Sequence, residues 1–276
     1  MPTDLPRGTA DSPTGPSPAD AAAEISRFGS AVLRDVWAAD QLAVLRDAIM
    51  GFCERRAALV ASGAADAMTR RYHEQGTVVL NWLLFEGRID LAFFSQMFAG
   101  SFYQQVCNAW FDDDQIVMAP ERLASRSLQP PHSALTALPY HQDSYTQDRR
   151  VARVLNCWIP LDPGAGRTSP GIEVVRDPGR PGFERQHAAG AAPGEGYEAI
   201  AIDRARIVAE YGDNFLAPAF EVGDALVFSQ DVIHRTYVEP QMTGPRLGFE
   251  FRVFSLKHLA PWASAEELAA EAYPLV

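Results

Sequence analysis

The sequence contains few cysteines, and their arrangement limits the chemistry they can perform. Its 276 residues include only Cys53, Cys107 and Cys157, which are widely spaced and form no C-x-x-C pair. An odd number of isolated cysteines argues against a disulfide framework and against a thiolate zinc site. Unpaired cysteines are typical of a reducing compartment, so we expect the protein in the cytoplasm.

Long hydrophobic runs and an excess of positive charge are also lacking. The most apolar stretch, Val78 to Phe85, is too short to cross a bilayer and is interrupted by Asn81. The first residues lack the basic start and apolar run of a secretory signal. The formal net charge is −11, and a polyanionic surface repels the phosphates of nucleic acids. We therefore expect neither a membrane nor a nucleic acid as partner, and the oligomeric state is not indicated.

The composition that remains is typical of a folded protein, with 47% hydrophobic and 21% charged residues. The length suffices for one large domain with its own core. Residues 1–22 are rich in Pro, Ala, Gly, Ser and Asp and show no apolar periodicity, which predicts a disordered tail. We expect residues 23–276 to form a single domain.

The first half of this domain has mainly helical patterns. After a short predicted strand at residues 30–36, Asp40 is a candidate helix cap. The helix that follows would place apolar residues on one face, namely Leu42, Leu45, Ile49 and Phe52. Residues 77–110 are apolar and aromatic, and we expect helices there that pack on the outside of a sheet.

The second half has the pattern of short β-strands. Segments bounded by Pro, Gly or Asp predict strands at residues 116–118, 153–161, 171–175, 225–228 and 247–254. Several short strands of this kind are typical of a sandwich or barrel. The Gly- and Pro-rich residues 163–196 predict a functional or disordered loop, and Ser264 with Glu267 forms a candidate capping box for a last helix.

Two segments carry residues suited to bind a metal. In Tyr140-His141-Gln142-Asp143, a strand would point His141 and Asp143 to the same side. In the second segment, a Gly-Asp turn precedes an apolar strand, and His234 follows at its far end. Two histidines and one carboxylate on adjacent strands form a facial triad, which leaves coordination positions open as in non-heme iron(II) oxygenases.

The H-x-D pattern alone is weak evidence, because it is common on ordinary surface strands. The residues after His234 strengthen it. Arg246 opens a strand beyond a Thr-Gly-Pro turn, and its guanidinium is suited to bind a carboxylate through two hydrogen bonds. Thr236 offers a hydroxyl for the same carboxylate. Arg252 would lie on the same strand face as Arg246 and is the second candidate anchor. Its alternative role is an ordinary salt bridge, for example to Glu250.

These motifs, in this order, resemble the phytanoyl-CoA dioxygenase family of iron(II)/2-oxoglutarate oxygenases. The resemblance runs from Phe28 to Phe254. It includes the H-x-D motif, the strand after it, a Gly-containing segment and the region around His234. The matching parts are the opening segment from Phe28, His141-Gln-Asp143, Asn156-Cys-Trp158-Ile-Pro-Leu-Asp, Ser169-Pro-Gly171-Ile-Glu-Val-Val, and Gly223-Asp224 to His234 with Thr236 and Arg246.

The resemblance implies a mainly β protein with flanking helices and a double-stranded β-helix core of the jelly-roll or cupin-like kind. It implies that His141, Asp143 and His234 bind iron(II), and that Arg246 and Thr236 bind 2-oxoglutarate with Trp158 nearby. The sequence departs from the family after Val175, where a Gly-Ser-His turn is replaced by Arg-Asp-Pro-Gly-Arg. It also departs from the family pattern after His234. The resemblance therefore does not identify the substrate.

We therefore expect a dioxygenase that uses O₂ and 2-oxoglutarate to hydroxylate an unactivated C–H bond of a small molecule, releasing succinate and CO₂. Asp143 argues against a halogenase, in which the resemblance implies loss of that carboxylate. Tyr145 and Asn156 are candidate substrate residues, because each has the strand parity of the residues around the metal. Desaturation or ring closure, a barrel enzyme without 2-oxoglutarate, a protein hydroxylase and a non-catalytic binding protein remain open alternatives.

Overall fold

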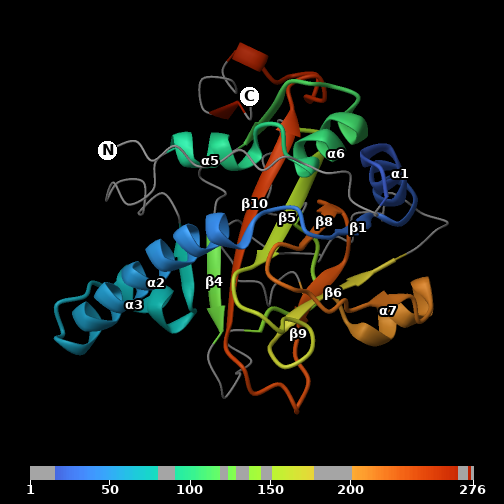
Figure 1. The fold of residues 1–276 in the computed structure, drawn as a ribbon. Helices are drawn as coiled ribbons and strands as arrows, with labels where there is room; N and C mark the ends of the chain where they lie inside the picture. The colour runs from blue at the N-terminus through green and yellow to red at the C-terminus, as the bar shows by residue number, and fades with distance from the viewer. Residues whose placement is uncertain are drawn as a thin grey trace.

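The computed structural model describes residues 16–79, 91–118, 124–128, 137–143, 151–176, 201–266 and 273–274. Helices and strands alternate irregularly along the chain (Figure 1). The helices are α1 (Pro18–Phe28), α2 (Ala39–Ala61), α3 (Ala67–Glu74), α5 (Leu91–Phe98), α6 (Phe102–Phe111) and α7 (Arg204–Tyr211). The strands are β1 (Ser30–Leu33), β2 (Thr77–Val79), β3 (Ile116–Met118), β4 (Ala124–Leu128), β5 (Val154–Pro160), β6 (Gly171–Val175), β7 (Phe215–Leu216), β8 (Ala225–Ser229), β9 (His234–Tyr237), β10 (Arg246–Ser255) and β11 (Tyr273–Pro274).

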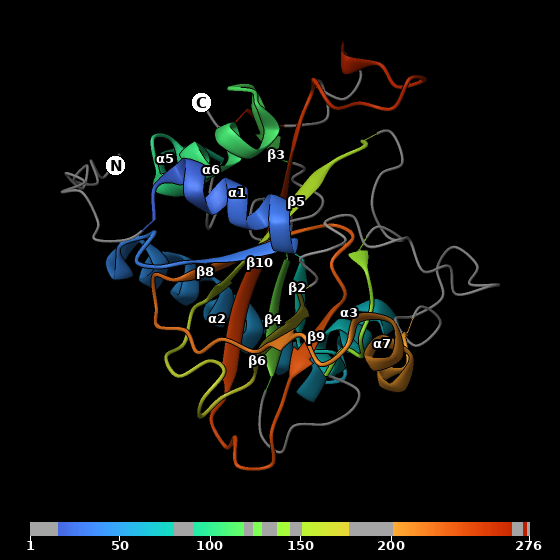
Figure 2. The same ribbon diagram turned by 90° about the vertical axis from the view of Figure 1, so that its right-hand side faces the viewer.

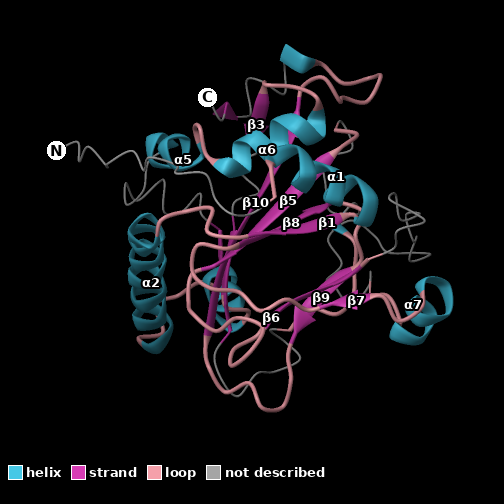
Figure 3. Cartoon of the chain, turned by 45° about the vertical axis from the view of Figure 1, so that its right-hand side comes forward, coloured by secondary structure: helices cyan, strands magenta, loops and turns pink. Residues whose placement is uncertain are grey.

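The strands form two antiparallel sheets that face each other (Figure 3). The larger sheet has the order β1-β8-β5-β10-β3-β11, and β4 pairs with both β10 and β2. The smaller sheet has the order β7-β6-β9. The long strand β10 pairs with β5 along most of its length, so that Gly248 lies opposite Pro160 and Phe254 opposite Val154.

Helices α1, α2, α5 and α6 cover the outer face of the larger sheet (Figures 1 and 2). The strands present every second side chain to these helices, as the twofold repeat of a strand requires. Buried apolar residues on this face include Leu155, Cys157 and Ile159 of β5 and Leu247, Phe249, Phe251 and Val253 of β10. The predicted helix residues Leu42, Leu45, Ile49 and Phe52 pack against them, which confirms the helical periodicity read from the sequence.

A second core fills the space between the two sheets. Trp158, Leu226 and Phe228 project from the larger sheet, and Ile172 and Val174 project from the smaller one. The alternation predicted for β5 is therefore confirmed: Asn156 and Trp158 face the inside of the sandwich, and their neighbours face the helices. Mainly β sheets with flanking helices in this arrangement form the expected double-stranded β-helix.

Two predictions for the N-terminal region are wrong. The structure has a helix where the tail was expected to continue to residue 22, because Ser17 and Asp20 form a capping box and α1 begins at Pro18. Ala21, Ala22 and Ile25 of this helix are buried. Asp40 is not the cap. α2 begins at Ala39, and the residue before it, Ala38, makes no side-chain cap hydrogen bond.

The strand predictions agree with β3, β5, β6, β8 and β10 to within one residue at each end. His234 is the exception, since it begins the separate strand β9 in the smaller sheet rather than ending β8. Tyr145, Glu267 and residues 177–196 of the expected loop lie outside the described residues. No helix among the described segments combines the length and the apolar character needed to cross a membrane.

Candidate metal centre

Backbone pairing brings the two predicted metal-binding segments together. His141 donates its N–H to the carbonyl of His234 at 2.9 Å, and His234 donates to the carbonyl of His141 at 3.0 Å. The two residues thus form an isolated antiparallel bridge between distant parts of the chain. Their imidazole rings lie on the same side of this bridge, with ring centroids 4.2 Å apart.

His141, Asp143 and His234 together can hold one metal ion. One ligand atom from each lies within 4.8 Å of the other two, and all three side chains are buried. Asp143 Oδ1 is 3.6 Å from Nε2 of His141 and 4.0 Å from Nε2 of His234. These separations suit three ligands around one small cation, because metal–nitrogen and metal–oxygen bonds are roughly 2.0–2.2 Å long.

Both imidazoles are oriented by backbone carbonyls. Nδ1 of His141 lies 2.7 Å from the carbonyl of Pro139, and Nδ1 of His234 lies 3.0 Å from that of Val232. A carbonyl only accepts hydrogen bonds, so each Nδ1 donates its N–H to the backbone, and Nε2 is the ring nitrogen that faces the centre. Burial, and then the neighbouring His141, lowers the pKa of His234 to about 4. The His234 ring is therefore a neutral ligand at neutral pH.

Asp143 is fixed by an arginine on β10. Arg252 Nη2 lies 2.9 Å from Asp143 Oδ2, while Oδ1 faces the histidines. Burial raises the pKa of Asp143, but Arg252 and the two histidines outweigh this effect and hold the pKa well below its usual range. The carboxylate thus stays ionised, with one oxygen paired to Arg252 and the other directed to the centre. Arg252 thus pairs with Asp143 and not with Glu250, which the sequence offered as its salt-bridge partner.

Arg246 lies at the other end of the inner face of β10 and is 3% exposed. Its Nη1 donates to the carbonyl of Gly171 at 2.8 Å, and its Nε has no hydrogen-bond partner. Among the described residues, no carboxylate forms an ion pair with it. Burial, followed by repulsion from Arg126, lowers the pKa of Arg246 to about 9. A buried guanidinium that lacks an anionic partner is costly unless an anion binds beside it.

The other predicted cosubstrate residues lie around this arginine. Trp158 has its ring centroid 5.5 Å from the Arg246 guanidinium carbon. Thr236 is on β9 opposite Ile172, the neighbour of the Gly171 carbonyl that Arg246 contacts. Its hydroxyl oxygen accepts a hydrogen bond from the Leu138 N–H at 3.0 Å, which leaves the hydroxyl proton to be donated elsewhere. The structure therefore groups Arg246, Thr236 and Trp158.

The inner face of β10 contains one residue that the sequence did not single out. A Cβ atom on Gly248 would lie 2.5 Å from Trp158 Nε1. Gly248 therefore leaves room for the Trp158 indole to lie across β10 beside Arg246. The signal in the sequence was the glycine itself, since an isolated glycine inside a strand often marks a close approach.

A second group missed in the sequence braces the segment before His141. Tyr140 donates its hydroxyl to Glu173 Oε2, which also accepts from Arg235 Nε at 2.6 Å. Burial, and then the hydrogen bond with Glu173, raises the pKa of Tyr140 to about 12. On the other side, Gln142 Nε2 donates to the carbonyl of Asp231 at 2.6 Å. Residues on both sides of His141 are thus held to the β6–β9 sheet and to the turn after β8.

The two candidate substrate residues have different outcomes. Asn156 is 4% exposed and pairs in register with Arg252, so it lies on the inner face near the metal centre as its parity predicted. Tyr145 lies outside the described residues. Each remains a prediction as a substrate contact.

No protein-family model matches this chain, and no curated protein matches it in sequence. Solved structures do share its fold. One is EctD from S. alaskensis with 2-oxoglutarate and 5-hydroxyectoine, at 14% identity over 90% of this chain and 80% of that one, with a TM-score of 0.57.

The non-heme alpha-ketoglutarate-dependent carbocyclase SnoK from nogalamycin biosynthesis is 12% identical over 88% of this chain and 87% of that one, with a TM-score of 0.58. EvdO2 from Micromonospora carbonacea var. aurantiaca, complexed with 2-oxoglutarate, is 18% identical over 89% and 93%, with a TM-score of 0.56. At these identities the similarity establishes a shared fold.

Proposed function

We propose that this chain is an iron(II)- and 2-oxoglutarate-dependent dioxygenase that acts on a small molecule. The proposal rests on one combination. A buried triad of two histidines and one carboxylate is accompanied, on the inside of the same sandwich, by the buried guanidinium of Arg246, which forms no ion pair among the described residues and has only the more distant charge of Glu250 to offset it. The triad accounts for a metal, and Arg246 accounts for an anionic cosubstrate.

The donor set fits iron(II). Two imidazole nitrogens and one carboxylate oxygen on one side of a metal ion leave the remaining positions for exogenous ligands, as in non-heme iron oxygenases. When bound, iron(II) and 2-oxoglutarate supply the activation of O₂, with release of succinate and CO₂. His141 and His234 would hold the metal through Nε2, and Asp143 would hold it through Oδ1 while Arg252 keeps Oδ2.

The residues near β6 would bind the far end of the cosubstrate. Arg246 donates to the distal carboxylate of 2-oxoglutarate, which supplies the anion that this buried cation lacks. Thr236 adds a hydroxyl donor, and Trp158 forms an apolar wall that excludes water from the same space. A dry pocket strengthens the attraction between guanidinium and carboxylate.

Hydroxylation of an unactivated C–H bond is the reaction we propose. Fold neighbours described as a carbocyclase and an epimerase show that this architecture also hosts other outcomes, so ring closure and desaturation are the nearest alternatives. A barrel enzyme that needs no 2-oxoglutarate would leave the buried charge of Arg246 unexplained. A non-catalytic binding protein would leave the complete triad unexplained.

The first experiment is an anaerobic titration of the metal-free protein with iron(II) and 2-oxoglutarate, followed by visible absorption. We expect a weak charge-transfer band that requires both additions, because 2-oxoglutarate must chelate the metal to produce it. His141→Ala and His234→Ala should lose the band together with iron binding. His73→Ala, on α3 and outside the triad, is the matched control and should retain it.

Different results separate the alternatives. Iron binding without the band would retain the triad and reject 2-oxoglutarate, which favours an enzyme of another type. Failure to bind iron in the wild-type protein would reject the proposal and favour a non-catalytic role. If the band appears, release of succinate in the presence of candidate small molecules then identifies the substrate.

A further inference from the structure

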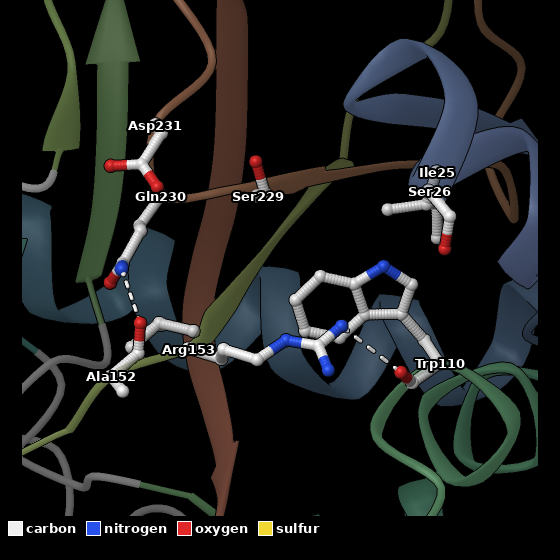
Figure 4. Close-up of a pocket in the computed structure, with 9 residues that line it drawn as sticks. Ile25, Ser26, Trp110, Ala152, Arg153, Ser229, Gln230 and Asp231 are labelled. Carbon is white, nitrogen blue, oxygen red and sulfur yellow. Dashed lines mark hydrogen bonds between the residues drawn. The ribbon is translucent and has the colours of Figure 1, made fainter. Parts of the chain in front are cut away.

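A pocket of about 250 Å³ lies between α1, α6 and the ends of β5 and β8 (Figure 4). It contains none of the triad residues, and it contains none of Arg246, Thr236 and Trp158. The polar residues that line it are Ser26, Trp110, Arg153, Ser229, Gln230 and Asp231. These residues come from four separate parts of the chain, so the fold assembles this pocket rather than one local turn.

The most informative of these residues is Arg153. Its guanidinium carbon lies 3.9 Å from the ring centroid of Trp110, and Nη2 donates to the Trp110 carbonyl at 3.2 Å (Figure 4). Within the described ranges it forms no ion pair, although Asp231 lines the same pocket. Arg153 is thus a half-buried cation above an aromatic ring, with N–H groups left to donate.

Two further polar atoms of the wall lack partners. Trp110 Nε1 and Ser229 Oγ are both buried, and neither has a hydrogen-bond partner. An indole N–H donates only, and a serine hydroxyl donates one hydrogen bond. Together with Arg153 they place three donor groups in the wall, beside the carboxylate of Asp231 as an acceptor. Buried polar groups without partners are uncommon in folded proteins and often indicate a missing ligand or ion.

The carboxylate of Asp231 limits which anion fits. The Asp231 carboxylate repels any anion, and it repels a dianion such as hydrogen phosphate more strongly than a monoanion, so a singly charged group paired with Arg153 is the better fit. A planar carboxylate also matches the planar guanidinium fork. We propose that this pocket binds the carboxylate of a small monocarboxylic acid, with Arg153 as its counter-ion and Trp110 and Ser229 as neighbouring donors.

The pocket is connected to the metal centre by hydrogen bonds. The carbonyl of Asp231 accepts from Gln142 Nε2, and Gln142 lies between His141 and Asp143. Gln230 Nε2 in turn donates to the carbonyl of Ala152 at 3.0 Å, next to Arg153. An acid beside Asp231 would therefore contact a residue whose backbone is hydrogen-bonded to the segment of His141 and Asp143. The pocket itself contains no metal ligand, so its binding does not depend on the proposed function.

The test is an NMR titration of ¹⁵N-labelled, metal-free, full-length protein with sodium benzoate. The chain has five tryptophans, and the indole N–H signal of Trp110 is assigned from its absence in Trp110→Phe. We expect that signal to shift saturably with benzoate. The signal of Trp262, which is 73% exposed, should not shift and serves as an internal control. Benzamide and inorganic phosphate should produce no comparable shift.

Variants then test whether Arg153 binds the carboxylate of benzoate. Arg153→Gln should weaken benzoate binding at least about tenfold, or 1.4 kcal/mol, and Arg153→Lys should weaken it less because the charge remains. Arg167→Gln, an exposed arginine paired with Glu221, is the matched control and should bind as the wild type does. If Arg153→Gln disturbs the other four indole signals, Ser229→Ala takes its place and should also weaken binding.

Several results would overturn the proposal. These are a Trp110 signal that does not saturate, an equal response to benzamide or phosphate, or full binding by Arg153→Gln. Loss of binding in Arg246→Gln would also overturn it, because benzoate would then occupy the site near β6. Since the titration is done without metal, its failure leaves the iron and 2-oxoglutarate proposal untouched, and the reverse is also true.

Discussion

The two faces of β10 have opposite chemistry although they belong to one strand. The face toward the helices carries Leu247, Phe249, Phe251 and Val253, each no more than 1% exposed. The face toward the smaller sheet carries Arg246, Gly248, Glu250 and Arg252. The outer face stabilises the domain by burying apolar area, whereas the inner face places charges where they have few partners within the chain.

This difference separates stability from function along a single strand. Burial of the outer side chains releases them from water and fills a close-packed core. Burial of the inner arginines costs free energy, and the cost is offset only by specific anions: Asp143 for Arg252 and, as we propose, a cosubstrate for Arg246. Substitutions on the two faces should therefore change different measurements.

The largest expected effect is on the outer face. Phe251→Ala removes a ring that contacts Phe98, Tyr103 and Trp37 and should lower the free energy of unfolding by about 3–5 kcal/mol. Urea denaturation measures this change. Iron affinity of the molecules that remain folded should be unchanged, and a parallel loss of iron affinity would mean that the two faces are not independent.

Arg252→Gln should come next, because it leaves the buried Asp143 carboxylate without its cation. We expect the metal-free protein to lose about 3 kcal/mol of unfolding free energy, as is typical when one partner of a buried ion pair is removed. Zinc(II) should restore more stability in this variant than it adds to the wild type, since the metal then supplies the missing positive charge. Thermal denaturation with and without zinc(II) tests both statements, and equal gains would contradict this role for Arg252.

Arg246→Gln should affect binding rather than folding. We expect 2-oxoglutarate affinity to fall by at least about 2 kcal/mol, or roughly thirtyfold, because a buried carboxylate would lose its charged partner. The free energy of unfolding should stay the same or rise, since a desolvated charge has been removed. Isothermal titration calorimetry measures the affinity. Arg167→Gln, an exposed arginine paired with Glu221, provides the matched control, and a similar loss there would point to a general charge effect.

The smallest effect should follow from Gly248→Ala. The added methyl group would meet Trp158 Nε1 at 2.5 Å, so the indole must move, at a cost of about 1–3 kcal/mol. Because Trp158 lies beside Arg246, 2-oxoglutarate affinity should decrease while iron affinity is retained. Unchanged binding of both would show that the indole position does not matter for the cosubstrate.

Much of this arrangement was predictable because strand parity decides which side chains share a face. The alternation at Asn156 and Trp158 gave the inner face of β5 correctly. His141 and Asp143 do meet at one centre, but the expected strand is absent there, and His141 forms only an isolated bridge. The strand at Ala124–Leu128 was missed because its Ala-Ser-Arg-Ser-Leu sequence has no clear apolar alternation. The pairing of Arg252 with Asp143 depends on how distant segments are aligned, and no local pattern contains that information. The start of α1 was missed although Ser17 and Asp20 signal it, because the surrounding Ala- and Pro-rich composition suggested disorder.

The bridge between His141 and His234 has a consequence for how the protein is made. β1, near the start of the chain, pairs with β8, and the metal-binding segment at His141 pairs with β9. On the ribosome, the early helices and strands must therefore wait until residues beyond His234 have emerged before either sheet can close. Such long-range pairing slows folding, so a chain interrupted before β9 would expose its apolar helices and could not be loaded with metal.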